Sequence, residues 1–204
     1  MSIPDAFVKA LQNTSVPHFK YFRSVRSTNS LALEWLEEDA PDGAIIFADH
    51  QSAGRGRFER TWLTEPGNAL AVSIIVKPAL HEIDFLSLFS PLAGIALLDV
   101  LDKSLKIEAQ IKWPNDVLIH RMKTAGILTE TIWNGDVILG LVVGIGVNIL
   151  PQSVPSPQNL TYPATCIQDH CANPVDRYVI LSDFLNAFAY WRSKIHLSDF
   201  MNQW

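Results

Sequence analysis

The feature that most restricts the fold is the longest apolar run of the chain, which spans residues 137–150. Three glycines and Asn148 interrupt this run. A membrane-spanning helix needs about 20 consecutive apolar residues, so the run is too short to be one. Its length and composition instead predict a buried strand.

Helical patterns lie on either side of a series of expected strands. Ser27 or Thr28 can cap a short helix that ends near Glu38, and residues 85–105 repeat leucine and isoleucine at helical spacing. Asn173 followed by a proline predicts the start of a terminal helix over residues 173–197. Strands are expected at residues 44–49, 69–76, 107–112, 117–120, 125–130 and 136–150. This order predicts an α+β fold, with a mixed, largely antiparallel sheet and flanking helices.

Composition and charge restrict the class of protein. The 204 residues are 48% hydrophobic, which is enough for the core of one ordinary domain. The net charge of −5 argues against a general nucleic-acid binder, so no nucleic-acid partner is expected. The first 20 residues have no uninterrupted apolar core, and we therefore expect no secretory signal, no membrane association and a cytoplasmic location. We expect residues 1–204 to form a single domain.

Two cysteines, Cys166 and Cys171, lie close together with His170 beside the second. They fit a metal or redox site, or two free thiols in a reducing compartment. Because no second pair of ligands occurs at a recognised spacing, we expect free thiols and no metal site of this kind.

The first motif with chemical meaning is GRGRFERTW, residues 54–62. Glycines allow close approach of the backbone to a ligand, and arginines donate forked hydrogen bonds to phosphate or carboxylate. The motif is neither a Walker loop nor a dinucleotide fingerprint, because the glycines and lysine that those need are missing. A solvated basic loop is the alternative. We expect residues 51–68 to be one long loop that is mobile without ligand.

Three further motifs follow, and each has a plain structural alternative. KWPND at residues 112–116 ends a strand and presents an amide and a carboxylate, or is a hairpin turn with a packed tryptophan. KTAGIL at residues 123–128 places a lysine before an apolar strand, or is a solvated strand edge. GIGVN at residues 144–148 lets a ligand approach the backbone, or is a β-bulge.

In this order, the motifs resemble the catalytic domain of the biotin protein ligases, or biotin–[acetyl-CoA-carboxylase] ligases. The resemblance runs from Ser27-Thr28-Asn29 and Gln51 through all four motifs and covers residues 22–150, with residues 151–172 as a connector. It implies a fold similar to class II synthetases. It also implies ATP, biotin and Mg²⁺, which form biotinyl-5'-adenylate, and transfer of biotin to a lysine of a biotin carboxyl carrier protein.

The resemblance also assigns site residues. The implied biotin contacts are Ser27, Thr28, Asn29, Gln51, Gly54, Arg55 and Gly126. The implied nucleotide contacts are Arg57, Arg60, Trp62, Lys112, Asn115 and Asn148. Lys123, Arg57 and Asp116 are implied to act in catalysis. Arg57, Lys112 and Lys123 are therefore expected to converge on one cavity. A helix cap at Thr28 and plain core packing of Trp62 and Trp113 are the structural alternatives.

The chain departs from the resemblance at both ends. Too few residues precede the match for the DNA-binding domain of many members, and we expect no repressor function. The chain also stops where an SH3-like domain usually begins. A lipoate or octanoate ligase or transferase of the same superfamily and a non-catalytic biotin- or nucleotide-binding module stay open as alternatives. A homodimer through a sheet edge also stays open.

Overall fold

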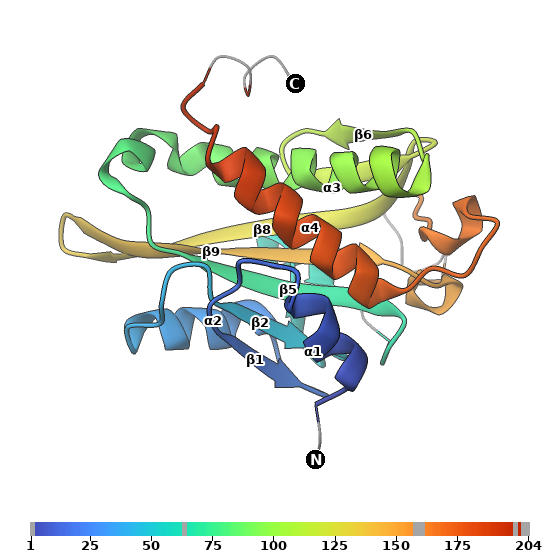
Figure 1. Cartoon of the computed structure of the whole chain (residues 1–204), viewed down its shortest axis with the longest axis horizontal. Coiled ribbons are helices and arrows are strands. Elements are labelled where there is room, and N and C mark those ends of the chain that lie inside the picture. The colour runs from blue at the N-terminus through green and yellow to red at the C-terminus, as the bar shows by residue number, and fades with distance from the viewer. Residues whose placement is uncertain (1–2, 63–64, 157–161, 198–199, 201–204) are drawn as a thin grey trace.

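The computed structural model is built around one seven-stranded sheet (Figure 1). It describes residues 3–62, 65–156, 162–197 and 200, apart from the side chain of Glu59. Only β1 and β2 run parallel, and the other neighbouring pairs are antiparallel. The prediction of a mixed, largely antiparallel sheet is therefore confirmed. Across the sheet the strands are β1 (Phe19–Phe22), β2 (Ile45–Ala48), β5 (Ala69–Val76), β9 (Val137–Asn148), β8 (Met122–Asn134), β7 (Asp116–Ile119) and β6 (Ala109–Lys112).

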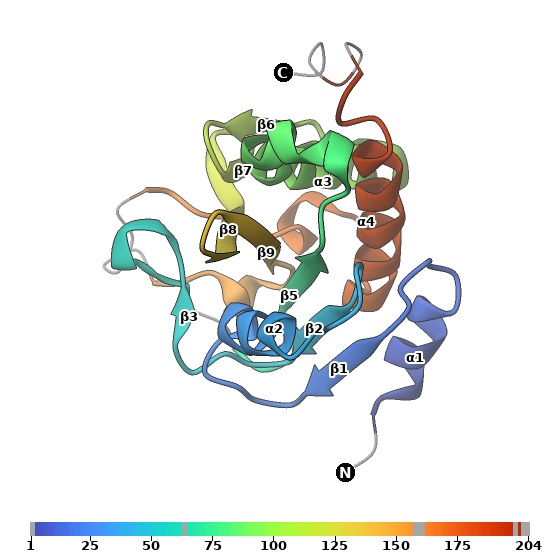
Figure 2. The same ribbon diagram turned by 90° about the vertical axis from the view of Figure 1, so that its left-hand side faces the viewer.

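Helices cover both faces of this sheet (Figure 2). The larger core lies under α1 (Asp5–Leu11), α3 (Phe89–Leu105) and α4 (Arg177–Arg192). The smaller core lies on the other side, under α2 (Thr28–Glu37). A short hairpin of β3 (Gly54–Arg55) and β4 (Thr61–Trp62) stands apart from the sheet. Short 3-10 helices occur at Arg57–Glu59, Leu80–Leu88, Pro151–Ser153 and Gln168–His170.

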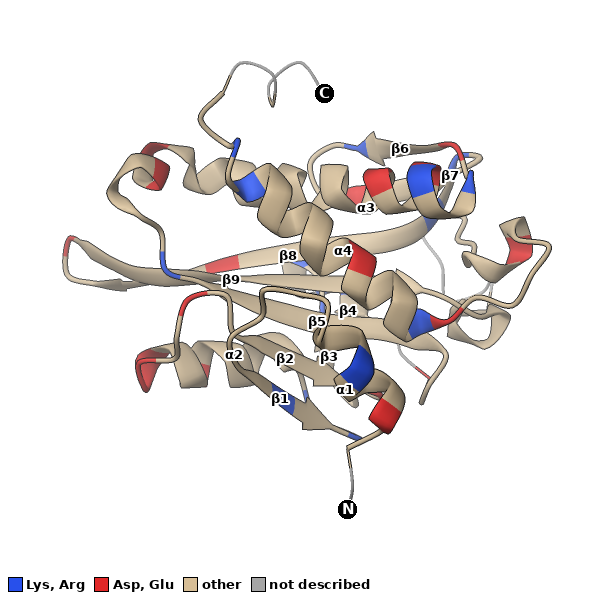
Figure 3. Ribbon diagram, in the orientation of Figure 1, with Lys and Arg blue, Asp and Glu red and all other residues tan. Residues whose placement is uncertain are grey.

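The two central strands, β5 and β9, explain the apolar run. Neither contains a charged residue (Figure 3), and β9 is buried from Gly140 to its end. A strand covered on both faces must be apolar along its whole length rather than at alternate positions. The buried strand predicted here is confirmed, with its ends at Val137 and Asn148.

The segment Leu80–Leu105 is also long and apolar enough to cross a membrane by length and composition. Half of its most apolar window is buried inside the protein. Leu92, Leu97 and Leu101 of α3 are completely buried in the larger core. Packing against the sheet and α4 therefore accounts for the hydrophobicity of this helix.

Several predicted boundaries differ from the structure. The helix predicted from Phe85 is a 3-10 helix up to Leu88 and an α-helix from Phe89. The terminal helix begins at Arg177, and its start at Asn173 was wrong. The side chain of Gln168 holds the intervening segment in a loop, because its amide bonds the backbone at residues 173 and 175.

Other segments differ in kind or were not predicted. The segment expected as one long loop, residues 51–68, contains the β3–β4 hairpin, while residues 63–64 lie outside the described part. α1 and β1 were not predicted. The connector contains two 3-10 helices and a buried Ser153, and its residues 157–161 lie outside the described part.

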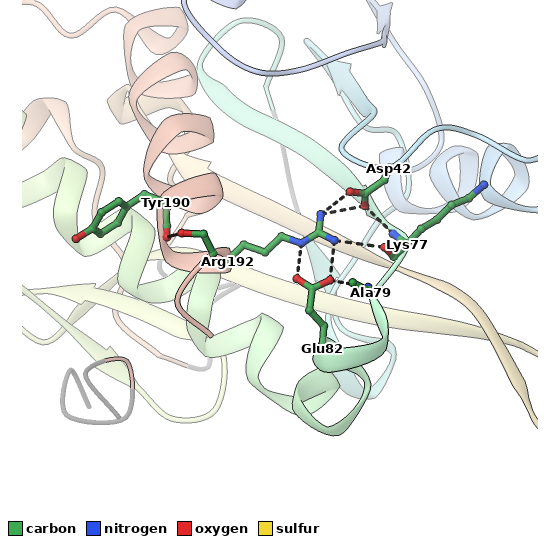
Figure 4. A network of polar contacts seen from close by, with 7 residues as sticks. Asp42, Lys77, Ala79, Glu82, Tyr190 and Arg192 are labelled. Atoms are coloured by element: carbon green, nitrogen blue, oxygen red, sulfur yellow. Dashed lines mark hydrogen bonds and ion pairs between the residues drawn. The ribbon is translucent and has the colours of Figure 1, made fainter. Parts of the chain in front are cut away.

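One ionic network ties the end of α4 to the 3-10 helix before α3 and to the turn between α2 and β2 (Figure 4). Arg192 donates from Nε to Glu82 Oε1 at 2.8 Å and from Nη1 to both carboxylate oxygens of Asp42 at 2.9 Å. Burial raises the pKa of Glu82, but the hydrogen bonds from Arg192 and the backbone of Ala79 outweigh it and leave that pKa lowered. The network fixes these segments against one another without taking part in the cavity described next.

Candidate active site

A cavity of about 590 Å³ lies between the start of α2, the β3–β4 hairpin, the turn from β6 to β7, and strands β8 and β9. All but one of the residues predicted to form the site line it. These residues are Ser27, Thr28, Asn29, Gln51, Arg55, Arg57, Arg60, Trp62, Lys112, Asn115, Asp116, Lys123, Gly126 and Asn148. The expected convergence of Arg57, Lys112 and Lys123 on one cavity is therefore met. Gly54 is not among the lining residues.

Gly54 instead makes room for the packing beneath the hairpin. A Cβ at this position would lie 2.4 Å from the carbonyl oxygen of Trp62 and 3.0 Å from Gln51 Nε2. Cβ atoms essentially never approach other atoms within 3.0 Å. The glycine therefore sets how closely β4 and the side chain of Gln51 approach each other.

One part of the cavity, which we call the neutral end, is lined by Thr28, Asn29 and Gln51 and includes Ser73 directly behind them. The backbone N–H of Thr28 donates to Gln51 Oε1 at 2.7 Å, and the hydroxyl of Thr28 lies 3.0 Å from the same oxygen. The helix cap is Ser27, whose hydroxyl accepts from the backbone N–H of Ser30. The interpretation of Thr28 as a helix cap is therefore wrong. Its side chain instead pairs with a residue from the loop after β2.

Asn29 extends the neutral end across the sheet. Its Nδ2 donates to the carbonyl oxygen of Leu128 at 3.1 Å and to Glu130 Oε2 at 2.8 Å. A Cβ on Gly144 would lie 1.9 Å from Asn29 Oδ1, so only glycine leaves space for this amide. Glu130 also forms an ion pair with Arg55 of the hairpin at 2.8 Å.

The opposite part, which we call the basic end, consists of Arg57, Lys112 and Lys123. Lys123 Nζ forms an ion pair with Asp116 Oδ1 at 2.7 Å, and both side chains are partly exposed to the cavity. The backbone of Lys123 is fixed by hydrogen bonds with Pro163 and Thr165. Lys112 Nζ lies 3.8 Å from the ring centre of Tyr162. The lysines are thus held beside the cavity, and an anion entering it would meet cations from three separate segments.

Asn115 and Asn148 lie near the basic end and have one hydrogen bond each to the backbone. Asn115 Nδ2 donates to the carbonyl oxygen of Ile127 at 2.9 Å, which closes the turn after β6 onto β8. Asn148 Nδ2 donates to the carbonyl oxygen of Thr165 at 3.1 Å. Each of these amide groups therefore keeps its oxygen and one N–H for a ligand.

Two histidines lie beside Thr165, the residue whose carbonyl oxygen accepts from Asn148. Thr165 Oγ1 lies 2.9 Å from His170 Nε2, and the ring of His170 lies 5.3 Å from that of His120. Burial lowers the pKa of His170, and the neighbouring charge of His120 lowers it further. A neutral His170 is therefore favoured beside the loop that holds Asn148.

The indole of Trp62 covers a floor of two glycines between the neutral and basic ends. Gly126 of β8 and Gly146 of β9 are paired directly across the sheet. A Cβ on Gly146 would lie 2.3 Å from Trp62 Cε2, and one on Gly126 would lie 3.2 Å from Cζ3. Lys123 Nζ is 5.6 Å from the centre of the indole. The register is regular through residues 144–147, so the interpretation of GIGVN as a β-bulge is wrong.

The chain matches a known protein family over more than half of its length. The model described as the biotin/lipoate A/B protein ligase family matches residues 21–148. The chain belongs to this family. The matched range contains every site residue predicted from the sequence.

Two relatives show how close the similarity to other members of the biotin/lipoate A/B protein ligase family is. The bifunctional ligase/repressor BirA of Bacillus spizizenii is 35% identical over 173 residues, which are 84% of this chain and 52% of that protein. The biotin–[acetyl-CoA-carboxylase] ligase of Paracoccus denitrificans is also 35% identical over 173 residues, 83% of this chain and 70% of its own length. The chain thus spans about half the length of the first relative.

A solved structure gives the same result for the fold. The biotin protein ligase from Aquifex aeolicus, in complex with biotin and ATP, superposes with a TM-score of 0.75 at 27% identity. The match covers 88% of this chain and 72% of that one. The sheet and its flanking helices are therefore those of biotin protein ligases.

Some features of this family member were not found from the sequence. Ser73 and Glu130 hold the neutral end, and Tyr162 contacts Lys112, but none of them lies in a recognised motif. Of these three residues, Ser73 could have been found from the sequence, because it is a polar residue inside the otherwise apolar strand β5. Trp113 is 75% exposed beside the cavity, so its interpretation as plain core was wrong.

The turn of the β3–β4 hairpin is exposed and has a strained backbone. Arg57 lies at this turn, beside Phe58, whose ring is 81% exposed and whose φ is +55°. Bulky residues with positive φ are uncommon and store strain. Mobility of this segment without ligand stays a prediction.

Cys166 and Cys171 are free thiols, the first buried and the second half-buried. Burial raises the pKa of both, so neither is activated as a thiolate. Among the residues that the structure describes, no group of three or more His, Cys, Asp or Glu side chains is placed to hold a metal ion.

Proposed function

We propose that this chain activates biotin with ATP to give biotinyl-5'-adenylate and transfers the biotin to a lysine of a biotin carboxyl carrier protein. The observation that carries the proposal is the single cavity that joins the neutral end to the basic end. Biotin has an uncharged cyclic urea at one end and a carboxylate at the other. ATP brings further negative charge to the carboxylate. The two ends of the cavity match these two chemistries.

The neutral end supports biotin rather than lipoate. A cyclic urea offers two N–H donors and a carbonyl acceptor to buried polar groups, whereas the dithiolane ring of lipoate offers none of comparable strength. Leaving a buried hydroxyl or amide without a partner costs about 1–3 kcal/mol. We assign Ser27, Thr28, Asn29, Gln51, Arg55 and Gly126 to biotin on this basis. Gly54 acts only through the packing of Gln51.

The basic end addresses the electrostatic obstacle of the first step. A carboxylate oxygen of biotin attacks the α-phosphorus of ATP, and the bond to the leaving pyrophosphate breaks. Two unit charges about 3.5 Å apart repel by roughly 5 kcal/mol at an effective dielectric of 20. Lys123, Lys112 and Arg57 would offset this repulsion as placed cations. We assign six residues to the nucleotide, namely Arg57, Arg60, Trp62, Lys112, Asn115 and Asn148.

A magnesium ion fits the oxygen atoms that line the basic end. Mg²⁺ is commonly held by one or two carboxylates together with phosphate oxygens and water. Asp116 offers a carboxylate, and the amide oxygens of Asn115 and Asn148 are the parts of those side chains not bonded to the backbone. When bound, the ion would neutralise charge on the phosphates.

The second step needs a neutral amine. The acceptor lysine attacks the acyl carbon of the adenylate, and AMP leaves with the bonding electrons. Asp116 is paired with Lys123 in this structure. We propose that Lys123 turns toward the phosphate when the substrates bind, which frees Asp116 to accept the proton of the incoming ammonium group.

Further expectations concern the setting of this reaction. A carrier protein as partner, a cytoplasmic location and a single domain over residues 1–204 stay predictions. A homodimer through a sheet edge is tested by light scattering of the purified chain at several concentrations.

The deciding experiment is exchange of labelled pyrophosphate into ATP. We expect exchange that depends on biotin and Mg²⁺. Exchange with lipoate but not biotin would favour the lipoate or octanoate branch of the family. Binding of biotin or ATP without exchange would favour a non-catalytic module. Transfer is then measured as incorporation of labelled biotin into a carrier domain.

A further inference from the structure

Ser73 is a hydroxyl in the middle of a strand that is otherwise apolar. β5 is buried along its whole length, and Ser73 itself has no exposed surface. A buried hydroxyl is costly unless it is hydrogen-bonded. Ser73 Oγ lies 2.6 Å from Asn29 Oδ1 and 2.8 Å from Thr28 Oγ1. The serine therefore joins two residues that line the cavity, although it does not line the cavity itself.

The direction of this hydrogen-bonded chain is set at its far end. Glu130 Oε2 accepts from Asn29 Nδ2, and the carbonyl oxygen of Leu128 accepts from the same nitrogen. Two acceptors on one side of the amide require its nitrogen to face them. Asn29 Oδ1 must then face Ser73, where it can only accept.

The hydroxyl of Ser73 carries one proton for two neighbours. The amide oxygen of Asn29 cannot donate, whereas the hydroxyl of Thr28 can, and that hydroxyl lies 3.0 Å from Gln51 Oε1. The proton of Ser73 therefore belongs on Asn29, at the shorter of its two contacts. The hydrogen bond between the two hydroxyls, at 2.8 Å, is then donated by Thr28 to Ser73 Oγ. This direction leaves the lone pairs of Thr28 Oγ1 as acceptors at the wall of the cavity.

We infer that Glu130, Asn29 and Ser73 form a relay of hydrogen bonds that fixes the Thr28 hydroxyl as an acceptor for a ring N–H of the substrate. Ser73 and Glu130 are then positioning residues for recognition of a cyclic urea. The inference rests on the proposed function, because it needs biotin as the ligand of this cavity. The ion pair of Glu130 with Arg55 also connects the relay to the hairpin.

The test is the dissociation constant of biotin and, separately, of ATP, each measured by calorimetry. Ser73→Ala removes the proton that the relay requires and adds no volume. We expect the Kd of biotin to rise about tenfold, as for a lost buried hydrogen bond, while the Kd of ATP stays within about twofold. Ser153→Ala is the matched control, because Ser153 is also buried and bonds only a nearby carbonyl oxygen.

A double-mutant cycle shows whether Ser73 acts through Thr28. If it does, Ser73→Ala should add little to the loss already caused by Thr28→Val. Fully additive losses would overturn the relay. So would an equal rise in the Kd of biotin and of ATP after Ser73→Ala, which indicates general damage to the fold.

Variants at Glu130 keep the inference testable if Ser73→Ala does not fold. Glu130→Leu removes the side-chain acceptor of Asn29 and leaves only the more distant carbonyl oxygen of Leu128, whereas Glu130→Gln keeps an amide oxygen there. Both variants remove the charge paired with Arg55. The relay predicts weaker biotin binding for Glu130→Leu and substantial recovery for Glu130→Gln. Equal biotin affinities in the two variants would overturn it. If the unaltered chain binds no biotin at all, the proposed function itself fails. Normal biotin binding in both Ser73→Ala and Glu130→Leu overturns the relay alone.

Discussion

At the neutral end of the cavity, Thr28, Asn29, Gln51 and Ser73 are each at most 9% exposed and are joined by hydrogen bonds. At the basic end, Lys123 and Asp116 keep roughly a quarter and a fifth of their side-chain surface exposed. Buried neutral polar groups are costly unless they are hydrogen-bonded, whereas partly exposed cations are stabilised by water until an anion binds. The first end is therefore held in place by its own hydrogen bonds before a ligand binds, whereas the excess positive charge of the second is offset when an anion binds.

This contrast predicts which measurement each end controls. Changes at the neutral end should alter binding of biotin, because its hydrogen bonds are the same before and during the reaction. Changes at the basic end should alter the chemical step, because charge at the α-phosphorus changes as the reaction proceeds.

The largest expected effect is that of Lys123→Ala. Biotin-dependent exchange of pyrophosphate should fall by about 100-fold or more, as when one preorganised donor to a developing charge is removed. The affinity for biotin alone should change far less. Lys103→Ala is the control, because Lys103 lies on the surface of α3 and pairs only with Asp99 there. Full exchange activity in Lys123→Ala would remove the basic end from the mechanism.

A second prediction separates the two ends within one strand. Gly144→Ala places a Cβ against Asn29 Oδ1, and Gly146→Ala places one against the indole of Trp62. We expect the first to raise the Kd of biotin, and the second to raise the Kd of ATP, each by about tenfold or more, because overpacking typically costs about 1–3 kcal/mol. Each variant is the control for the other. If each variant raised the Kd of both biotin and ATP, the two ends would not be independent.

A smaller effect is expected from Thr28→Val, which keeps the shape of the side chain and removes its hydroxyl. The Kd of biotin should rise about tenfold while the maximal exchange rate at saturating biotin stays nearly unchanged. Thr14→Val serves as control, since the hydroxyl of Thr14 bonds Leu11 beside α1. A fall in the maximal rate instead would show that the neutral end takes part in the chemical step.

The smallest expected effect is that of salt. Raising ionic strength from about 0.05 to 0.5 M should weaken ATP binding a few-fold, because the partly exposed cations are screened. Biotin binding should respond less, because biotin brings one negative charge to the basic end and ATP brings several. A similar salt dependence for both ligands would contradict the division of the cavity into a neutral and a charged part.

Much of the fold followed from patterns of a few residues. The apolar run of β9 and the helical spacing of α3 were visible because each element buries most of its length. The start of α4 was misplaced because Asn173 has good capping chemistry, but Gln168 holds the segment around it in a loop. β1 was missed because its four residues are only half-buried, which leaves a weak pattern.

The kinds of residue available to the site follow from the order of the amino acids, since arginines, lysines and glycines in four short motifs can be read without coordinates. Only the tertiary structure decided which of them meet. Asn29 and Glu130 are about a hundred positions apart, and Ser73 lies in a third segment, yet one chain of hydrogen bonds joins them. Local patterns cannot reveal such contacts, because they depend on which strands pair and in which register.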